Sequence, residues 1–208
     1  MKKYLVFLLT LFPFIINSNA QVRFGLKSGL NISSLHGDDA GDLDSKLGFA
    51  AGFLLSYQTK SIFILQPEIS YTMKGATTKV GSVSFTLAYD YVEIPILFKF
   101  ALPLDDSPNL KPSVFAGPFI AFKTKAKIIA KANGESDEAD IKKVTPRDYG
   151  FQVGAAMGFG LGKYELGFDI RYILGLSSID ESINHFDVKN NVLNINLYFC
   201  FANMQKLN

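Results

Sequence analysis

Hydrophobic and polar residues alternate with a period of two along most of the chain after residue 20. Such alternation is typical of β-strands, because successive side chains of a strand point to opposite faces of the sheet. In one run, Phe151 and Val153 alternate with Gly150, Gln152 and Gly154. Runs of this kind predict eight strands: 22–32, 47–57, 62–74, 89–100, 113–124, 148–161, 164–174 and 192–201.

The two faces of these predicted strands differ in charge and in side-chain size. One face has no charged residue and is rich in Leu, Ile and Phe, whereas the other holds every glycine of the runs. That second face also carries the charges: Arg23, Lys27, Lys74, Lys99, Lys123, Arg171, Glu68, Glu93, Asp148, Glu165 and Asp169. A soluble barrel or sandwich would turn the apolar face inward, and a membrane barrel would turn it toward lipid. Glycine favours the membrane barrel, because a narrow lumen has little room opposite long charged side chains.

The segments between the runs alternate in length, as in membrane barrels with short periplasmic turns and long extracellular loops. The long ones are 33–46, 75–88, 125–147 and 175–191, and the short ones are 58–61, 101–112 and 162–163. The sequence therefore predicts an all-β fold, an eight-stranded antiparallel up-and-down transmembrane β-barrel with both termini in the periplasm. Pro67, Pro95 and Pro118 fall inside predicted strands, where each removes a ladder hydrogen bond, so we expect local bulges or breaks there.

Residues 1–20 have the features of a cleavable signal peptide. Lys2 and Lys3 precede an apolar stretch, and small residues stand at Ser18 and Ala20. We expect export through this leader, with residues 21–208 forming one barrel domain in the cell outer membrane of a Gram-negative bacterium.

Charge and cysteine content exclude several classes of protein. The net charge of +2 is accounted for by Lys2 and Lys3, so the remaining chain is electrically balanced and is not expected to bind nucleic acid. The single cysteine, Cys200, cannot form an internal disulfide. No motif predicts a catalytic residue, a cofactor or a metal ligand set.

Three segments resemble a known family. They are Leu65–Tyr71 (LQPEISY), Tyr91–Leu97 (YVEIPIL) and Phe115–Phe119 (FAGPF), and the likeness continues through Glu165–Tyr172 (ELGFDIRY). This pattern is similar to the outer-membrane β-barrel proteins often labelled porin-family or PorT-like. The resemblance implies an eight-stranded outer-membrane barrel, and its motifs mark the barrel rather than a particular activity.

The charged face is the main candidate site. In a barrel of eight strands the interior is just wide enough for side chains, so we expect charges of both signs to pair across the lumen and plug it. The predicted network consists of Arg23, Lys27, Glu68, Glu93, Lys99, Glu165, Asp169 and Arg171.

These features predict a non-enzymatic protein that contacts outer-membrane lipid and, through its long loops, an extracellular or envelope protein partner. The alternatives are a narrow porin-like channel for small polar solutes, a lipid-modifying outer-membrane enzyme and a soluble lipocalin-like carrier. An enzyme of that kind would need a Ser–His–acid group near the outer rim, for which Ser34, His36 and Asp38 or Asp39 are the candidates.

Overall fold

The computed structural model describes residues 21–41, 43–58, 62–104, 106–107, 109–132, 134–179 and 187–202, so the predicted leader lies outside the described residues. These residues form nine strands. The strands are β1 (Gln21–His36), β2 (Asp44–Gln58), β3 (Phe63–Val80), β4 (Val83–Ala101), β5 (Leu110–Ala132), β6 (Glu135–Asp140), β7 (Arg147–Leu161), β8 (Tyr164–Gly175) and β9 (Lys189–Ala202). No helix in the described part of the chain is long and apolar enough to cross a bilayer.

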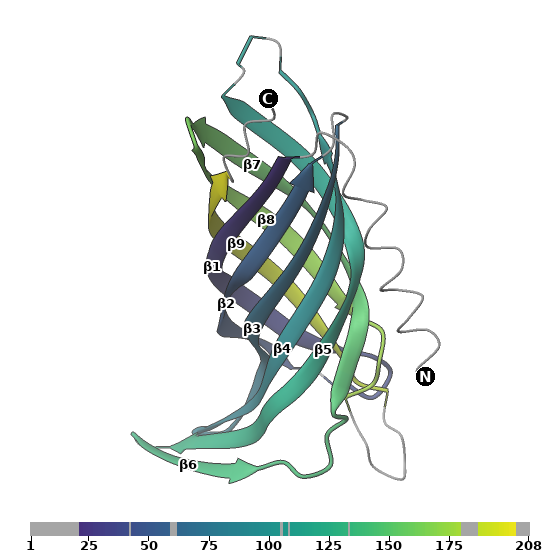
Figure 1. Ribbon diagram of the computed structural model, residues 1–208. Coiled ribbons are helices and arrows are strands. Elements are labelled where there is room, and N and C mark those ends of the chain that lie inside the picture. Colours follow the sequence, from purple (N-terminus) through teal and green to yellow (C-terminus); the bar gives the residue numbers. More distant parts are fainter. Residues whose placement is uncertain are drawn as a thin grey trace, which may run out of the picture.

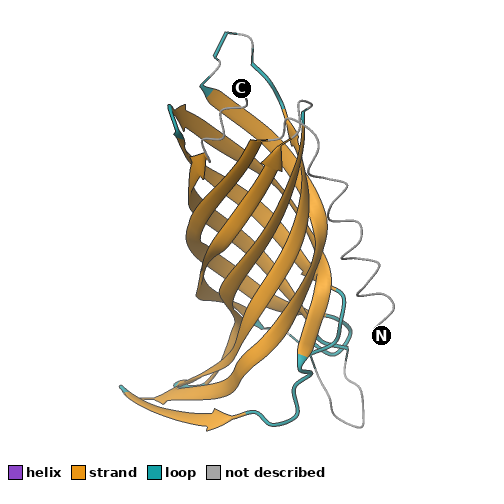
Figure 2. Ribbon diagram, viewed as in Figure 1, coloured by secondary structure: helices purple, strands orange, loops and turns teal. Residues whose placement is uncertain are grey.

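Eight of the nine strands close into a barrel (Figures 1 and 2). Each strand pairs antiparallel with the next one along the chain, and β9 pairs with β1 from Arg23↔Ala202 to His36↔Lys189. The exception is β6, which pairs only with the last part of β5, while β7 pairs with the first part. The predicted eight-stranded up-and-down barrel is therefore confirmed, with one further strand outside the ring.

The two ends of the barrel differ. The short-turn end holds the start of β1, the end of β9 and the connections β2–β3, β4–β5 and β7–β8. At the extended end, β3, β4 and β5 continue past the barrel wall and join β6 in a four-stranded blade, visible at the bottom of Figure 1. We define the blade as residues 76–80, 83–88, 127–132 and 135–140.

The blade corrects the predicted loops 75–88 and 125–147. The first is a continuous β3–β4 hairpin that turns at Gly81, which has a φ of 62°. The second begins as strand to Ala132 and returns as β6. Residues 83–88 (VSFTLA) do alternate and were missed as strand, whereas residues 76–80 (ATTKV) and 125–132 (KAKIIAKA) are rich in Thr, Lys and Ala, so their strand pattern is faint. A register shift between Asp90 and Tyr91, opposite Thr124, breaks the pattern further.

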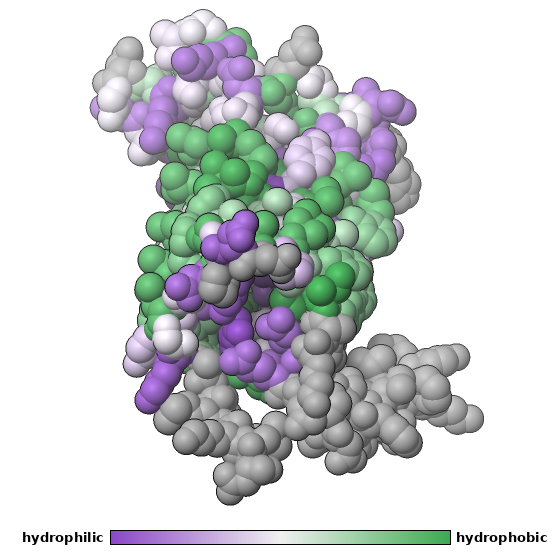
Figure 3. All heavy atoms as spheres, turned by 90° about the horizontal axis from the view of Figure 1, so that it is seen from above, coloured by the Kyte–Doolittle hydropathy of each residue, from purple (hydrophilic) through white to green (hydrophobic). Residues whose placement is uncertain are grey.

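The apolar face of the barrel points outward. Leu197 is 64% exposed and Val153 is 57% exposed, whereas the charged side chains of the opposite face lie inside, with Arg171 only 2% exposed. Seen from above, hydrophobic side chains cover much of the outer wall and hydrophilic ones gather at the opening (Figure 3). A lipocalin-like carrier would have the reverse arrangement, so that alternative is wrong.

Each proline within a strand interrupts the pairing on one side only. Pairing skips residues 66–67 between β2 and β3, residues 94–95 between β3 and β4, and residues 117–118 between β4 and β5. Pro67, Pro95 and Pro118 lack the N–H that would complete those ladders. The register is the same on both sides of each gap, so the predicted bulges or breaks take the form of breaks.

Aromatic side chains collect at both rims of the outer wall. At the short-turn end, the Phe63 and Phe100 rings lie 5.7 Å apart and the Tyr164 and Phe201 rings 6.0 Å apart. At the extended end, Tyr149 and Tyr172 are exposed. Two aromatic belts flanking an apolar band are typical of a barrel that spans a bilayer.

An outward-facing leucine at mid-depth tests this arrangement. We expect Leu197→Arg to lower the free energy of unfolding by about 2–4 kcal/mol in phospholipid vesicles, because it places a charge near the bilayer centre. Leu193→Arg provides the matched control, because it lies nearer the extended end of the same strand. It should lower the free energy of unfolding by less than Leu197→Arg does. Urea titration of the vesicle-folded variants measures both, and equal small losses would contradict lipid contact at Leu197.

Candidate functional site

The lumen is crossed at its centre by an ionic network built around Arg171 of β8. Its guanidinium donates to both carboxylate oxygens of Asp169, at 2.7 and 2.8 Å, and to Glu68 of β3 at 2.9 Å. Glu68 also accepts a 2.5 Å bond from Lys27 of β1. A third acceptor of Arg171 is the Gln152 side-chain oxygen, at 3.1 Å. The network thereby links strands on opposite sides of the barrel.

A second cluster lies toward the extended end around Lys74 of β3. Its Nζ is 2.7 Å from a Glu93 oxygen and 3.4 Å from a carboxylate oxygen of Asp148. Glu93 also accepts from Gln152, at 2.7 Å, which connects this cluster to the central network. The Phe119 ring lies 4.7 Å from Lys74 Nζ. This fully buried lysine is thus surrounded by two carboxylates and an aromatic face.

At the short-turn end the carboxylate is Glu165 of β8. Its Oε2 accepts from Arg23 at 2.5 Å and from Lys111 at 3.0 Å. Lys99 also lies in this region, but it forms no ion pair within 4 Å with a described residue, and its Nζ instead faces the rings of Phe115 and Tyr198. Glu165 is therefore surrounded by a lumen surface that also carries the basic side chains of Arg23, Lys99 and Lys111.

The structure places all eight predicted network residues in the lumen, and seven of them form ion pairs there. Lys99 is the exception among the eight. Sequence reasoning left Lys74 and Asp148 out of the network, although both lie on the charged face, because their pairing depends on the strand register. It also missed Lys111, since this residue falls in a predicted connection. Gln152, which joins Glu93 to Arg171, carries no charge, so the pattern of charged residues in the sequence did not identify it.

Burial of so many charges requires that each has partners. An unpaired charge in a dry interior costs several kcal/mol, and removing one member of a buried pair leaves the other uncompensated. Here amides supply the remaining hydrogen bonds, for example Asn196 to Asp169 at 2.9 Å and Asn190 to Asp148 at 3.0 Å. The central part of the lumen, around Arg171 and Lys74, is consequently a network of paired ionic groups and amides and not a row of free ionic groups.

An apolar cluster closes the extended end of the lumen. It consists of Leu35, Ala76, Tyr89, Tyr91, Phe119, Ala121, Ala126, Val144, Ile173, Ile179 and Val192. These side chains come from the barrel wall and from the segments after β6 and β8. These side chains lie between the Lys74 cluster and the extended end, and they separate that cluster from the solvent there.

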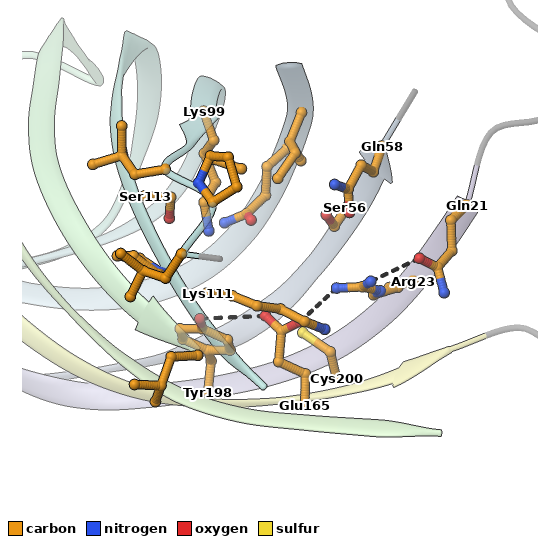
Figure 4. A pocket seen from close by; sticks show the side chains of 18 residues that line it. Gln21, Arg23, Ser56, Gln58, Lys99, Lys111, Ser113, Glu165, Tyr198 and Cys200 are labelled. Carbon is orange, nitrogen blue, oxygen red and sulfur yellow. Dashed lines mark hydrogen bonds and ion pairs between the residues drawn. The ribbon is translucent and has the colours of Figure 1, made fainter. Parts of the chain in front are cut away.

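The short-turn end, in contrast, is hollow. A cavity of about 550 Å³ opens there, lined by residues of β1, β2, β3, β4, β5, β8 and β9 (Figure 4). Its polar lining includes Arg23, Lys99, Lys111, Glu165 and Tyr198. Among the described residues, no group of three or more His, Cys, Asp or Glu could hold a metal ion.

A closed antiparallel barrel with an apolar outer wall and an ionic lumen is the architecture of an outer-membrane β-barrel protein. The family model "Outer membrane protein beta-barrel domain" matches residues 17–181, and the chain belongs to this family, whose members reside in the outer membrane. The match does not test the PorT-like subgroup, which stays a prediction. No match is found among curated proteins.

Solved structures of outer-membrane barrels are similar to this chain. OprG from Pseudomonas aeruginosa has a TM-score of 0.52 at 10% identity, covering 89% of this chain and 96% of that chain. Neisserial surface protein A has a TM-score of 0.48 at 14% identity, with 84% and 95% covered. Ail of Yersinia pestis has a TM-score of 0.43 at 15% identity, with 86% and 98% covered. At these identities the likeness to OprG supports the fold alone.

Arg171 provides a test of the lumen network. We expect Arg171→Met to lower the free energy of unfolding by about 3–5 kcal/mol, because Asp169 and part of the Glu68 charge lose their buried partner. Arg147→Met, at an exposed position on β7, should change it by no more than about 0.5 kcal/mol. Urea titration in vesicles compares the two, and similar values would show that the network contributes little.

Glycines that face the lumen test how tightly it is filled. A Cβ on Gly154 would lie 2.4 Å from the Ile170 carbonyl oxygen and 2.6 Å from Phe115 Cζ, whereas a Cβ on Gly160 would meet nothing closer than 3.5 Å. We expect Gly154→Ala to destabilise the barrel by about 1–3 kcal/mol through overpacking. Gly160→Ala should be neutral or slightly stabilising. Equal effects in the same urea assay would mean that the lumen can relax around an added methyl group.

Proposed function

We propose that this protein is a non-enzymatic outer-membrane barrel with a closed lumen, which presents its extended end to a protein partner outside the cell or in the envelope. The observation that carries the proposal is the bridge from Lys27 through Glu68 to Arg171, which spans the middle of the lumen. A solute crossing the barrel would have to break these buried pairs and displace the apolar cluster beyond them.

The orientation follows from the general architecture of such barrels, which place short turns in the periplasm and long extensions outside. We infer that the blade faces the cell exterior. The part of β5 in the blade carries Lys127 and Lys131, and the open-edge strand β6 carries four acidic residues. Lys127 and Glu138 form a 2.6 Å ion pair, and the hydrogen bond from Lys127 lowers the pKa of the Glu138 carboxyl.

A blade of this kind offers a charged edge with unpaired backbone groups, which supports a role in protein contact and not in burial. The second proposed partner of the protein is the bilayer lipid, which would contact the apolar outer wall of the barrel. The balanced charge of residues 21–208 gives no support for nucleic-acid binding.

The enzyme alternative receives little support from the described residues. The Asp39 carboxylate accepts the backbone N–H of Asp187 at 2.8 Å, and no hydrogen bond joins it to a histidine among the described residues. His36 ends β1 rather than lying in the predicted loop, and its Nδ1 is buried without a hydrogen-bond partner. His185 lies outside the described residues. We therefore keep the non-enzymatic proposal over a lipid-modifying one.

Electrical recording separates a closed lumen from a narrow channel. We expect the purified chain to give no stable conductance steps in planar bilayers, because the buried ion pairs of Glu68 with Lys27 and Arg171 span the middle of the lumen. The double variant Glu68→Ala and Arg171→Ala removes both sides of the bridge and leaves the apolar cluster in place, so conductance from this variant would show that the bridge alone closes the lumen. Robust, stable channels from the unaltered protein would refute the closed lumen and favour the porin-like alternative.

Heat-modifiable gel mobility reports folding of the double variant. Lys142→Ala, which removes an exposed charge at the extended end, is its matched control and should stay silent in the recordings.

A further inference from the structure

The cavity at the short-turn end contains a buried cation, Lys99, that has no counter-ion within 4 Å among the described residues. Lys99 of β4 is 7% exposed, and its Nζ lies 5.8 Å from the Phe115 ring centroid and 5.5 Å from that of Tyr198. By comparison, Lys27, Lys74 and Arg171 each have a carboxylate oxygen within 2.7 Å. Lys99 thus differs from these buried basic side chains of the same lumen.

The carboxylates in this half of the lumen are already engaged. Glu165 pairs with Arg23 and Lys111, and Glu68 pairs with Lys27 and Arg171. Asp169 is held by Arg171 and by the Asn196 amide. None of these groups can approach Lys99 without leaving another cation exposed to a poorly hydrated interior. A buried ammonium in such a position is stabilised when an anion from outside neutralises it.

The cavity around Lys99 is built to receive an anion. Its charged lining consists of Arg23, Lys99, Lys111 and Glu165, so cations outnumber carboxylates by three to one. The Lys99 side chain runs from β4 toward the cavity interior, with the side chain of Ser113 beside it (Figure 4). The hydroxyls of Ser56 and Ser113 and the Gln58 amide also line the space and can donate hydrogen bonds to an oxyanion.

The size of the space limits the ligand to a small solute. A volume of about 550 Å³ is in the range of small-molecule sites. Because the apolar cluster closes the other end of the lumen, a ligand would enter through the short-turn end. We infer that this cavity binds a small solute carrying a phosphate or carboxylate group, which pairs with Lys99.

Calorimetric titration of the detergent-solubilised chain with two probes, inorganic phosphate and acetate, tests this inference at constant ionic strength. We expect saturable binding of at least one probe, and a loss of affinity of at least about tenfold in Lys99→Met. Lys99→Arg keeps the charge and should retain most of the affinity. Lys142→Met removes an exposed charge at the far end and should leave binding unchanged.

Folding of Lys99→Met is checked by heat-modifiable mobility, and this variant should fold because it leaves no buried partner unpaired. The probe that binds more tightly identifies whether the site prefers phosphate or carboxylate. Absence of saturable binding for both probes, or equal binding by the unaltered chain and Lys99→Met, would overturn the inference. Either result leaves the closed-lumen proposal untouched, since binding in the cavity does not require or exclude conduction.

Discussion

The fold depends on the pairing of opposite charges inside a closed ring of strands. An apolar outer wall satisfies the bilayer, but it leaves the polar face of every strand pointing at a narrow interior. That interior would be unstable if the charges were unpaired, because desolvation of an isolated ion costs more than a typical strand contact contributes. Arg171 and Glu68 resolve the problem by reaching across the lumen from strands that are not neighbours in the sheet.

The same pairing determines where the barrel has small residues. Long side chains such as Arg171 and Tyr198 need open space beside them, and glycines on the same face supply it. Gly154 lies against Phe115 and Arg171, and Gly167 lies against the Tyr198 ring. The alternation of glycine with charged or aromatic residues is therefore a packing requirement of a narrow lumen, and it cannot be separated from the ionic network.

Sequence alone predicted the parts of the molecule where chemical contrast between the two faces is strong. In β7 the change from Phe151 to Gln152 to Val153 identifies a strand and both of its environments. Much of the blade lacks such contrast, because residues 76–80 and 127–132 are rich in Thr, Lys and Ala, and only residues 83–88 (VSFTLA) carry the two-residue pattern. The ion-pair partners were also beyond sequence reasoning. Whether Lys74 meets Glu93 and Asp148 depends on register and shear, which two-residue periodicity does not specify.

The two ends of the lumen are chemically unequal, and this inequality follows from the strand lengths. At the extended end, strands run past the barrel wall and the returning segments bring Val144 and Ile179 over the opening, so apolar side chains can seal it. At the short-turn end, the β7–β8 connection is a tight turn at Gly162, and the space inside the barrel is a cavity whose charged lining is mostly basic. The two ends therefore differ in chemistry as well as in length: apolar side chains fill the lumen where the strands are extended, and a polar cavity occupies it where the turns are short.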